Sequence, residues 1–246
     1  TLGPKNPWAY RNKMQMPVGG TKGDIQMGFY AMGSHDIVQG TNCPIQDEGN
    51  NIIAQACYQI AKEFDIEPYD EHTGKGVLRH VIGRIGQSGW MIILVTATEH
   101  LPHQEKWVEK LTERVPQVET IVHNVNGKRT NVILGPKNSV LHGDGTITDH
   151  IKDLRFTLSP HSFFQVNPEQ TTVLYDQALA YADLKGTEIV IDAYCGTGTI
   201  SLFLAHKAKH VIGIEIVEPA IINARENARR NGYDNTEFIV ADAAVE

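Results

Sequence analysis

Short apolar stretches alternate with helical patterns in the last third of the chain, and this alternation restricts the possible folds more than any other feature. The stretches contain no alternating polar residues, which is typical of parallel strands covered on both faces. The sequence therefore predicts an α/β fold with a parallel sheet in this region. The expected strands are residues 189–191, 211–214 and 238–241, and the expected helices are residues 171–182, 199–206 and 219–230.

A glycine-containing loop, Asp-Ala-Tyr-Cys-Gly-Thr-Gly-Thr over residues 192–199, joins the first strand to the next helix. Gly196 and Gly198 permit a tight turn and a close approach of the backbone to a ligand. A dinucleotide-binding loop would carry a third glycine where this chain has Ser201. The carboxylate of Asp192, ahead of the glycines, suits a cationic or amine-bearing ligand better than a pyrophosphate. S-adenosylmethionine carries both a sulfonium and an amine.

Two further acids follow the next two strands. Glu215 lies at the end of the second strand, 19 residues after Gly196, where an acid accepts hydrogen bonds from ribose hydroxyls. Asp242 follows the third strand and is placed to receive an adenine amino group. These positions predict S-adenosylmethionine as the cofactor, with a nucleotide cofactor and a purely structural loop as alternatives.

The chain up to residue 157 has a different organisation. Its order of strands and helices resembles a split βαβ sandwich, and we expect an α+β domain with an antiparallel sheet. The predicted domains are therefore residues 1–157 and residues 158–246. In the first domain, the expected helices are residues 47–64 and 103–115, and the expected strands are residues 25–30, 36–39, 77–85, 90–98, 119–124 and 130–134.

The charge of the chain is unevenly distributed. The net charge is −7, but residues 1–157 hold 16 basic and 17 acidic side chains, against 6 and 12 in residues 158–246. The first domain is nearly neutral and can still carry a basic face toward RNA, which is read by stacking and hydrogen bonds as well as by charge. Candidates for phosphate contact, with solvated charges as the alternative, are Arg11, Lys13, Arg79, His80, Arg84, Lys128 and Arg129.

A second motif, Ser-Pro-His-Ser-Phe-Phe-Gln-Val-Asn-Pro, covers residues 159–168. Together with residues 192–199 and with Gly-Ile-Glu at residues 213–215, it resembles the RNA uracil-5-methyltransferase family, in its 23S ribosomal RNA branch. Residues 7–13 and 43–45 also resemble the central domain of that family. The resemblance covers nearly the whole chain.

The resemblance implies a Rossmann-like class I methyltransferase sheet, incomplete in this chain, preceded by a central α+β domain and by a small N-terminal β-barrel. It implies methylation of uracil C5 in ribosomal RNA, by attack of a cysteine thiolate on C6 and later proton removal by a base. Both catalytic groups are expected beyond Glu246, so this chain is expected to bind cofactor and RNA without methylating. The residues expected to bind the cofactor, from the resemblance and the loop pattern together, are Gln165, Asp192, Tyr194, Gly196, Gly198, Thr199, Glu215 and Asp242.

Three cysteines fit a reducing, cytoplasmic setting rather than a disulfide framework. Cys195 is expected to pack under the glycine loop and Cys57 to lie in the core. Cys43 matches a position that ligates an iron–sulfur cluster in some relatives, and a plain buried thiol is the alternative.

No apolar run approaches 18 residues, which excludes a membrane span, and we expect a monomer. Two rival functions remain open. One is a transfer RNA uracil-5-methyltransferase, and the other is a non-catalytic RNA-binding module.

Overall fold

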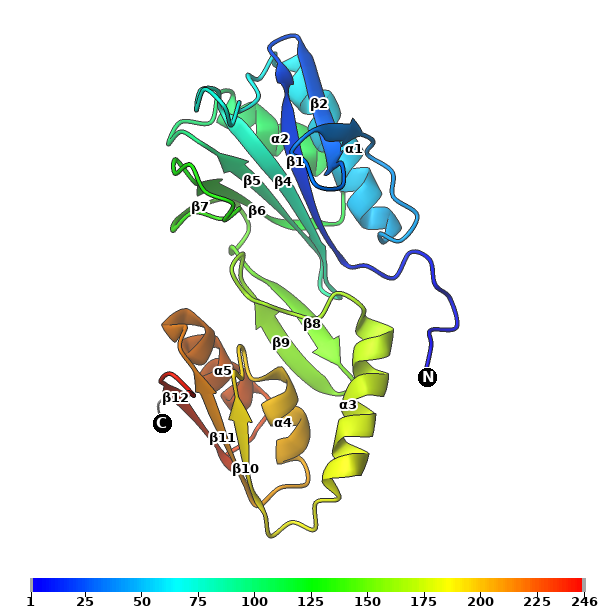
Figure 1. Ribbon diagram of the computed structural model, residues 1–246, viewed down its shortest axis with the longest axis vertical. Helices are drawn as coiled ribbons and strands as arrows, with labels where there is room; N and C mark the ends of the chain where they lie inside the picture. Colours follow the sequence, from blue (N-terminus) through cyan, green and yellow to red (C-terminus); the bar gives the residue numbers. More distant parts are fainter. Residues whose placement is uncertain (1, 245–246) are drawn as a thin grey trace. The chain divides into compact units, whose positions relative to one another are not determined.

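The computed structural model describes residues 2–244, and the chain divides into two compact units (Figure 1). The N-terminal unit is Asn6–Ile147, and the C-terminal unit is Thr148–Glu246 together with Thr1–Lys5. The division falls before the boundary expected after residue 157. Among residues 2–244, no helix is both long enough and apolar enough to cross a membrane.

A seven-stranded sheet with two helices forms the N-terminal unit, and its strand order is β3-β2-β1-β4-β5-β6-β7. The elements in chain order are β1 (Lys13–Thr21), β2 (Asp24–Tyr30), β3 (Ile37–Gln39), α1 (Glu48–Glu63), β4 (Leu78–Ile85), β5 (Trp90–Thr96), α2 (Gln104–Arg114), β6 (Val118–Val125) and β7 (Lys137–His142).

The sheet is mixed rather than wholly antiparallel. Strand β5 pairs parallel with β6, and α2 makes the crossover between them, whereas every other neighbouring pair is antiparallel. The expectation of an antiparallel sheet is therefore wrong at this pair, because a helix between two adjacent strands returns the chain in the same direction.

The strand expected over residues 130–134 is also wrong, and β7 begins only at Lys137. Side chains bind the carbonyl groups of that segment in place of a neighbouring strand. The Asn126 amide donates to the carbonyl oxygens of Val132 and Ile133, at 2.6 and 3.1 Å, and Arg79 donates to that of Thr130. The segment is an irregular connection held by these bonds.

Helix α1 packs on the sheet through one apolar face. The Asp47 carboxylate caps the helix by accepting from the Gly49 amide at 2.8 Å, as the sequence predicts. Ile53, Cys57 and Ile60 are fully buried in the core of this unit, together with residues of α2. The expectation that Cys57 is a core residue is confirmed.

The C-terminal unit contains a three-stranded parallel sheet of order β10-β11-β12 and a separate hairpin. Its elements are β8 (Ile147–Ile151), β9 (Leu154–Leu158), α3 (Pro168–Ala182), β10 (Ile189–Ala193), α4 (Thr199–Ala205), β11 (His210–Glu215), α5 (Glu218–Arg230) and β12 (Thr236–Val240). The predicted alternation of strand and helix is confirmed.

One face of this sheet stays exposed among the described residues, contrary to the expected cover on both faces. Val211 and Gly213 of β11 are buried, whereas Ile189 and Ile191 of β10 are 64% and 65% exposed. Right-handed crossovers between consecutive strands of one sheet place successive helices on the same face, so α4 and α5 leave the other face open.

A buried amide on α5 ties two separate segments of the C-terminal unit together. Asn227 is fully buried, its Oδ1 accepts from the Thr157 amide at 3.1 Å, and its Nδ2 donates to the Thr197 carbonyl at 3.1 Å. Thr157 belongs to β9 and Thr197 to the glycine loop. A single side chain therefore fixes the loop against the hairpin.

We expect Asn227→Ala to lower the free energy of unfolding of this unit by about 2–4 kcal/mol, because one buried and one half-buried backbone group lose their partners. The control is Asn223→Ala on the same helix, whose amide is half-buried and makes a longer bond, 3.3 Å, to Ser162. Urea unfolding, followed through amide resonances of the C-terminal unit, measures both variants. Equal losses in the two variants would contradict the assigned role.

Candidate functional site

Three carboxylates lie at one edge of the parallel sheet. Asp192 pairs in register with Gly213, Glu215 is the last residue of β11 and pairs with Val240, and Asp242 follows β12. Because the strands are parallel and adjacent, their carboxyl ends meet at the same edge. The structure thus brings together the three acids that the sequence singles out.

The glycine loop between β10 and α4 has an unusual backbone. Tyr194, Gly196 and Gly198 all have positive φ, at 67°, 56° and 79°. A tyrosine in this conformation is strained, and such strain clusters at ligand sites. The Tyr194 ring is 69% exposed, so it is free to contact a ligand.

Gly198 is also required by packing. A Cβ built at this position would lie 3.0 Å from the Phe238 ring and 3.2 Å from the Ala224 Cβ. Phe238 comes from β12 and Ala224 from α5. The glycine lets the start of α4 approach both elements, which lowers the loop onto the sheet.

The Glu215 carboxylate holds this loop. One oxygen accepts from the Gly196 amide at 3.2 Å, and the other accepts from the Val217 amide at 3.0 Å. A carboxylate has about four acceptor positions. Glu215 therefore keeps room for hydroxyl donors while its own orientation is fixed by the backbone.

Asp192 is held by a different donor. The hydroxyl of Ser201, a fully buried residue of α4, donates to the Asp192 carboxylate. Burial raises the pKa of Asp192, and the bond from Ser201 opposes that rise. The serine that stands where a dinucleotide loop would have a glycine thus supports the carboxylate.

Gln165 and Thr199 meet at a residue that the sequence reasoning missed. The Tyr175 hydroxyl of α3 lies 2.9 Å from the Thr199 Oγ1 and also hydrogen-bonds the Gln165 side chain. Tyr175 is buried, and burial raises its pKa. Only the helical periodicity of α3 could have indicated it, because an isolated tyrosine carries no motif.

Asp242, like Tyr194, is an exposed member of the expected cofactor residues. It is exposed, and its carboxylate accepts from the Ala244 amide at 3.0 Å. Its position after β12 agrees with the expectation, and its side chain is open to solvent.

Cys195 packs beneath the loop as expected. Its side chain is 5% exposed, and its sulfur would be 2.9 Å from a Cβ built on Gly213. Burial, with the nearby Asp192 and Glu215 charges, raises the pKa of Cys195 to about 12. Cys43 is half-buried and its backbone bonds to the Asn51 amide, and residues 2–244 contain no cluster of three or more His, Cys, Asp or Glu side chains arranged for a metal ion.

Several candidates for a phosphate-contacting face are buried instead. Arg79, His80 and Arg84 are 3%, 6% and 2% exposed. Arg79 donates to the carbonyls of Asn126 and Lys128, at 2.6 and 2.7 Å, so its charge binds the protein's own backbone. The hypothesis of phosphate contact is wrong for these three residues, because a buried guanidinium or imidazole cannot reach a phosphate in solvent.

The fold of the C-terminal unit is the Rossmann-like sheet of class I methyltransferases. A family model described as "Methyltransferase domain" matches residues 184–245, which include the glycine loop and all three acids. A solved structure, the Pyrococcus abyssi tRNA (uracil-54, C5)-methyltransferase in complex with S-adenosyl-L-homocysteine, is similar over 97% of this chain and 57% of that chain. The TM-score is 0.79 at 25% sequence identity.

Curated relatives extend the similarity over almost the whole sequence. A protein of Halalkalibacterium halodurans, named an uncharacterized RNA methyltransferase, is 51% identical over 99% of this chain and 54% of its own length. A protein of Clostridium acetobutylicum with the same description is 48% identical over 100% of this chain and 54% of its own length. The chain therefore spans about half the length of the curated relatives that it matches.

We expect Cys195 to resist alkylation in the folded protein. With its pKa near 12, the thiolate is scarce at pH 8, and iodoacetamide should modify Cys195 at least about a hundredfold more slowly than the half-buried Cys43. Peptide mass spectrometry after timed labelling measures both rates. Unfolding in urea should abolish the difference, and equal rates in the folded protein would contradict the assignment of Cys195 as a packing residue.

Proposed function

We propose that the C-terminal unit binds S-adenosylmethionine, and that the chain is part of an RNA methyltransferase that acts on uracil C5. The observation that carries this proposal is the set of carboxylates at three successive strand ends around a glycine loop. The named relatives and the structural neighbour in complex with S-adenosyl-L-homocysteine support it.

The residues of the site suit the chemistry of the proposed cofactor. Asp192 offers negative charge to a sulfonium or an amine, Glu215 offers acceptors to ribose hydroxyls, and Asp242 offers an acceptor to an adenine amine. The exposed Tyr194 ring gives a flat surface beside the loop. When bound, the cofactor would supply an electrophilic methyl group.

Gln165 adds an amide to the same edge of the site. Its side chain bonds to Tyr175, which itself contacts Thr199 at the start of α4. This network orients the amide and the threonine hydroxyl together. We assign Tyr175 as a positioning residue, and Gln165 and Thr199 as cofactor contacts.

Methylation of uracil C5 requires a thiolate, because the carbon is unreactive until a nucleophile adds to C6. Burial raises the pKa of both Cys57 and Cys195, so neither offers a thiolate at neutral pH. The proposed reaction therefore needs a cysteine other than these two.

Two RNA targets remain as candidates within this proposal. The motif at residues 159–168 supports ribosomal RNA through its resemblance, and we propose ribosomal RNA first. The name of the solved structural neighbour supports transfer RNA as the second candidate. Transfer of a labelled methyl group by the full-length natural protein, with ribosomal and transfer RNA transcripts offered in parallel, separates the two.

We expect Glu215→Ala to weaken binding of S-adenosylhomocysteine by about 1.5–3 kcal/mol, because hydrogen bonds to a charged group are lost. The control is Glu237→Ala on the neighbouring strand β12. The carboxylate of Glu237 is exposed, and its Oε2 lies 3.9 Å from His210 Nε2. Isothermal titration calorimetry on the 246-residue chain measures both affinities. Unchanged affinity in Glu215→Ala would remove the basis of the proposed cofactor site.

We expect Gln165→Ala to weaken S-adenosylhomocysteine binding while the melting temperature stays within about 2 °C of the parent. Tyr175→Phe is the companion variant, since it removes the shared hydroxyl and leaves the amide in place. If Gln165→Ala instead lowers the melting temperature by several degrees with affinity intact, the residue is structural and its assignment to the cofactor is wrong.

A further inference from the structure

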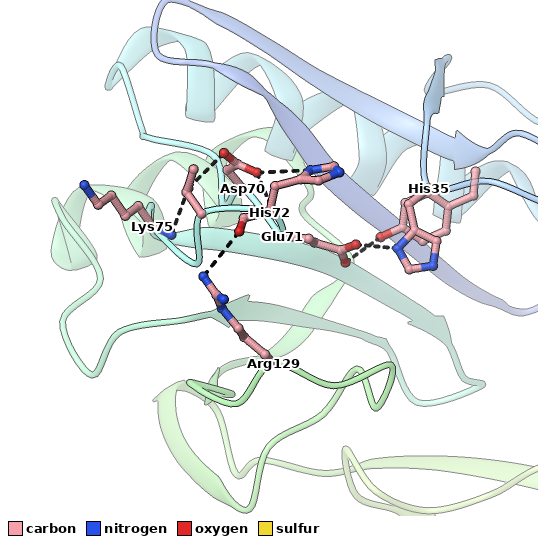
Figure 2. Close-up of polar contacts among 8 residues, drawn as sticks. His35, Asp70, Glu71, His72, Lys75 and Arg129 are labelled. Atoms are coloured by element: carbon pink, nitrogen blue, oxygen red, sulfur yellow. Dashed lines mark hydrogen bonds and ion pairs between the residues drawn. The ribbon is translucent and has the colours of Figure 1, made fainter.

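A separate cavity lies wholly within the N-terminal unit, between the β1–β2 strands, the loop before β3 and the loop that precedes β4. Its volume is about 200 Å³. Figure 2 shows that the side chains of His35 and Glu71 point toward one another across the gap between two of these loops. None of the cofactor residues assigned above contributes to it.

The mouth of the cavity is formed by a stacked pair of rings and a carboxylate. The Tyr30 and His35 rings lie 4.9 Å apart with an interplanar angle of 19°. The Tyr30 hydroxyl donates to one oxygen of Glu71 at 3.2 Å, and His35 Nδ1 contacts the other oxygen. Burial raises the pKa of Glu71, but the contacts with His35 and Tyr30 outweigh that effect and hold the pKa below its ordinary value. The carboxylate is therefore ionised and acts only as an acceptor.

The lining also holds a buried imidazole with one unpartnered nitrogen. His80 lines the cavity and is 6% exposed, and its Nδ1 has no hydrogen-bond partner among the described residues. Burial and the neighbouring Arg79 lower the pKa of His80 to about 4, so the ring is neutral at pH 7 and can donate or accept. An unpaired buried polar atom costs free energy, and because Nδ1 has almost no exposed surface, a ligand recovers that cost by pairing with it once the ring turns.

The charges around the cavity disfavour an anion. Asp36, Asp70 and Glu71 all line it. Arg79 lines it as well. Its terminal nitrogens donate to backbone carbonyls, its Cζ lies 4.4 Å from the centre of the Tyr69 ring, and its buried Nε has no partner among the described residues. A phosphate would therefore meet three carboxylates against one guanidinium, whose terminal nitrogens already bind backbone carbonyls.

The size of the cavity points to one small planar group. Sites for drug-sized ligands measure about 300–1,000 Å³, so 200 Å³ is too small for a whole nucleotide. A single heterocycle fits the volume, the aromatic mouth and the mixed polar lining. Proteins that read unpaired RNA stack its bases on aromatic side chains and bond their edges.

We propose that this cavity takes one unstacked nucleobase that bears an exocyclic amine, from single-stranded RNA. The base would stack against the Tyr30–His35 pair, its amine would donate to Glu71, and a ring nitrogen would pair with His80. Cytosine, adenine and guanine each carry an exocyclic amine beside a ring nitrogen, and uracil lacks the amine. The choice of RNA as the source of the base rests on the proposed function.

The test is a titration of the 246-residue chain with cytidine, adenosine and uridine, followed by the imidazole resonances of His35 and His80. Cytidine or adenosine should shift both, and uridine should bind at least about fivefold more weakly. Glu71→Gln should weaken cytidine binding about tenfold, as expected for loss of a bond to a charged group. Glu99→Gln, a control carboxylate paired with Lys137 outside the cavity, should leave cytidine binding unchanged.

Three results would overturn the proposal. They are no shift of either histidine with any nucleoside, equal affinity for uridine and cytidine, and the same shifts produced by inorganic phosphate alone. Binding of S-adenosylhomocysteine to Glu71→Gln, measured in parallel, keeps the two sites distinct. Loss of nucleoside response with cofactor affinity intact supports the base site, whereas a chain that binds nucleosides but no S-adenosylhomocysteine contradicts the proposed cofactor site and leaves the cavity assignment standing.

Discussion

The ring of Phe238 packs against two glycines, and the candidate cofactor site depends on this contact. A Cβ on Gly213 would lie 2.6 Å from the ring, and a Cβ on Gly198 would lie 3.0 Å from it. The first glycine lets β11 and β12 share one buried layer, and the second brings the start of α4 down onto that layer. Because both approaches exclude any side chain, the path of the loop over the strand ends is set by packing.

On this framework, each acid is oriented by the protein before any ligand arrives. Ser201 holds Asp192, the amides of Gly196 and Val217 hold Glu215, and the Ala244 amide holds Asp242. Groups fixed in this way need little reorganisation on binding, which is the usual benefit of a preorganised site. This arrangement has a cost at Asp192, because burial disfavours the charged carboxylate and raises its pKa.

In the C-terminal unit, the parallel sheet and its helices could be predicted because their pattern is local, whereas the β8–β9 hairpin was not predicted. Apolar strands, helical periodicity and glycines at a turn are all read over a few neighbouring residues, and Asp192, Glu215 and Asp242 follow directly from the strand ends. Tyr175 could not be predicted, because its role depends on a contact between α3 and α4. The exposed face of β10 was also missed, since apolar residues on a strand do not reveal which helices cover them.

The N-terminal unit was less predictable because several of its contacts join residues that are far apart in the sequence. The segment 130–134 has the composition of a strand, but Arg79 and Asn126 bind its carbonyls from a distance in sequence. Arg79 is a charged residue of a type that usually lies at the surface, but in this structure it is buried. Long-range pairing of this kind leaves no periodic signal, so the sequence indicates neither the irregular connection nor the buried guanidinium.

That guanidinium has a consequence for the durability of the connection between β6 and β7. Arg79 donates hydrogen bonds to the carbonyls of Asn126, Lys128 and Thr130. These bonds fix the connection near its start and divide one long loop into shorter spans. Shorter spans lose less entropy on closure. A protease must draw several consecutive residues into an extended conformation before it can cut. The shorter spans provide fewer such residues, so the Arg79 side chain of β4 makes this irregular segment more resistant to digestion.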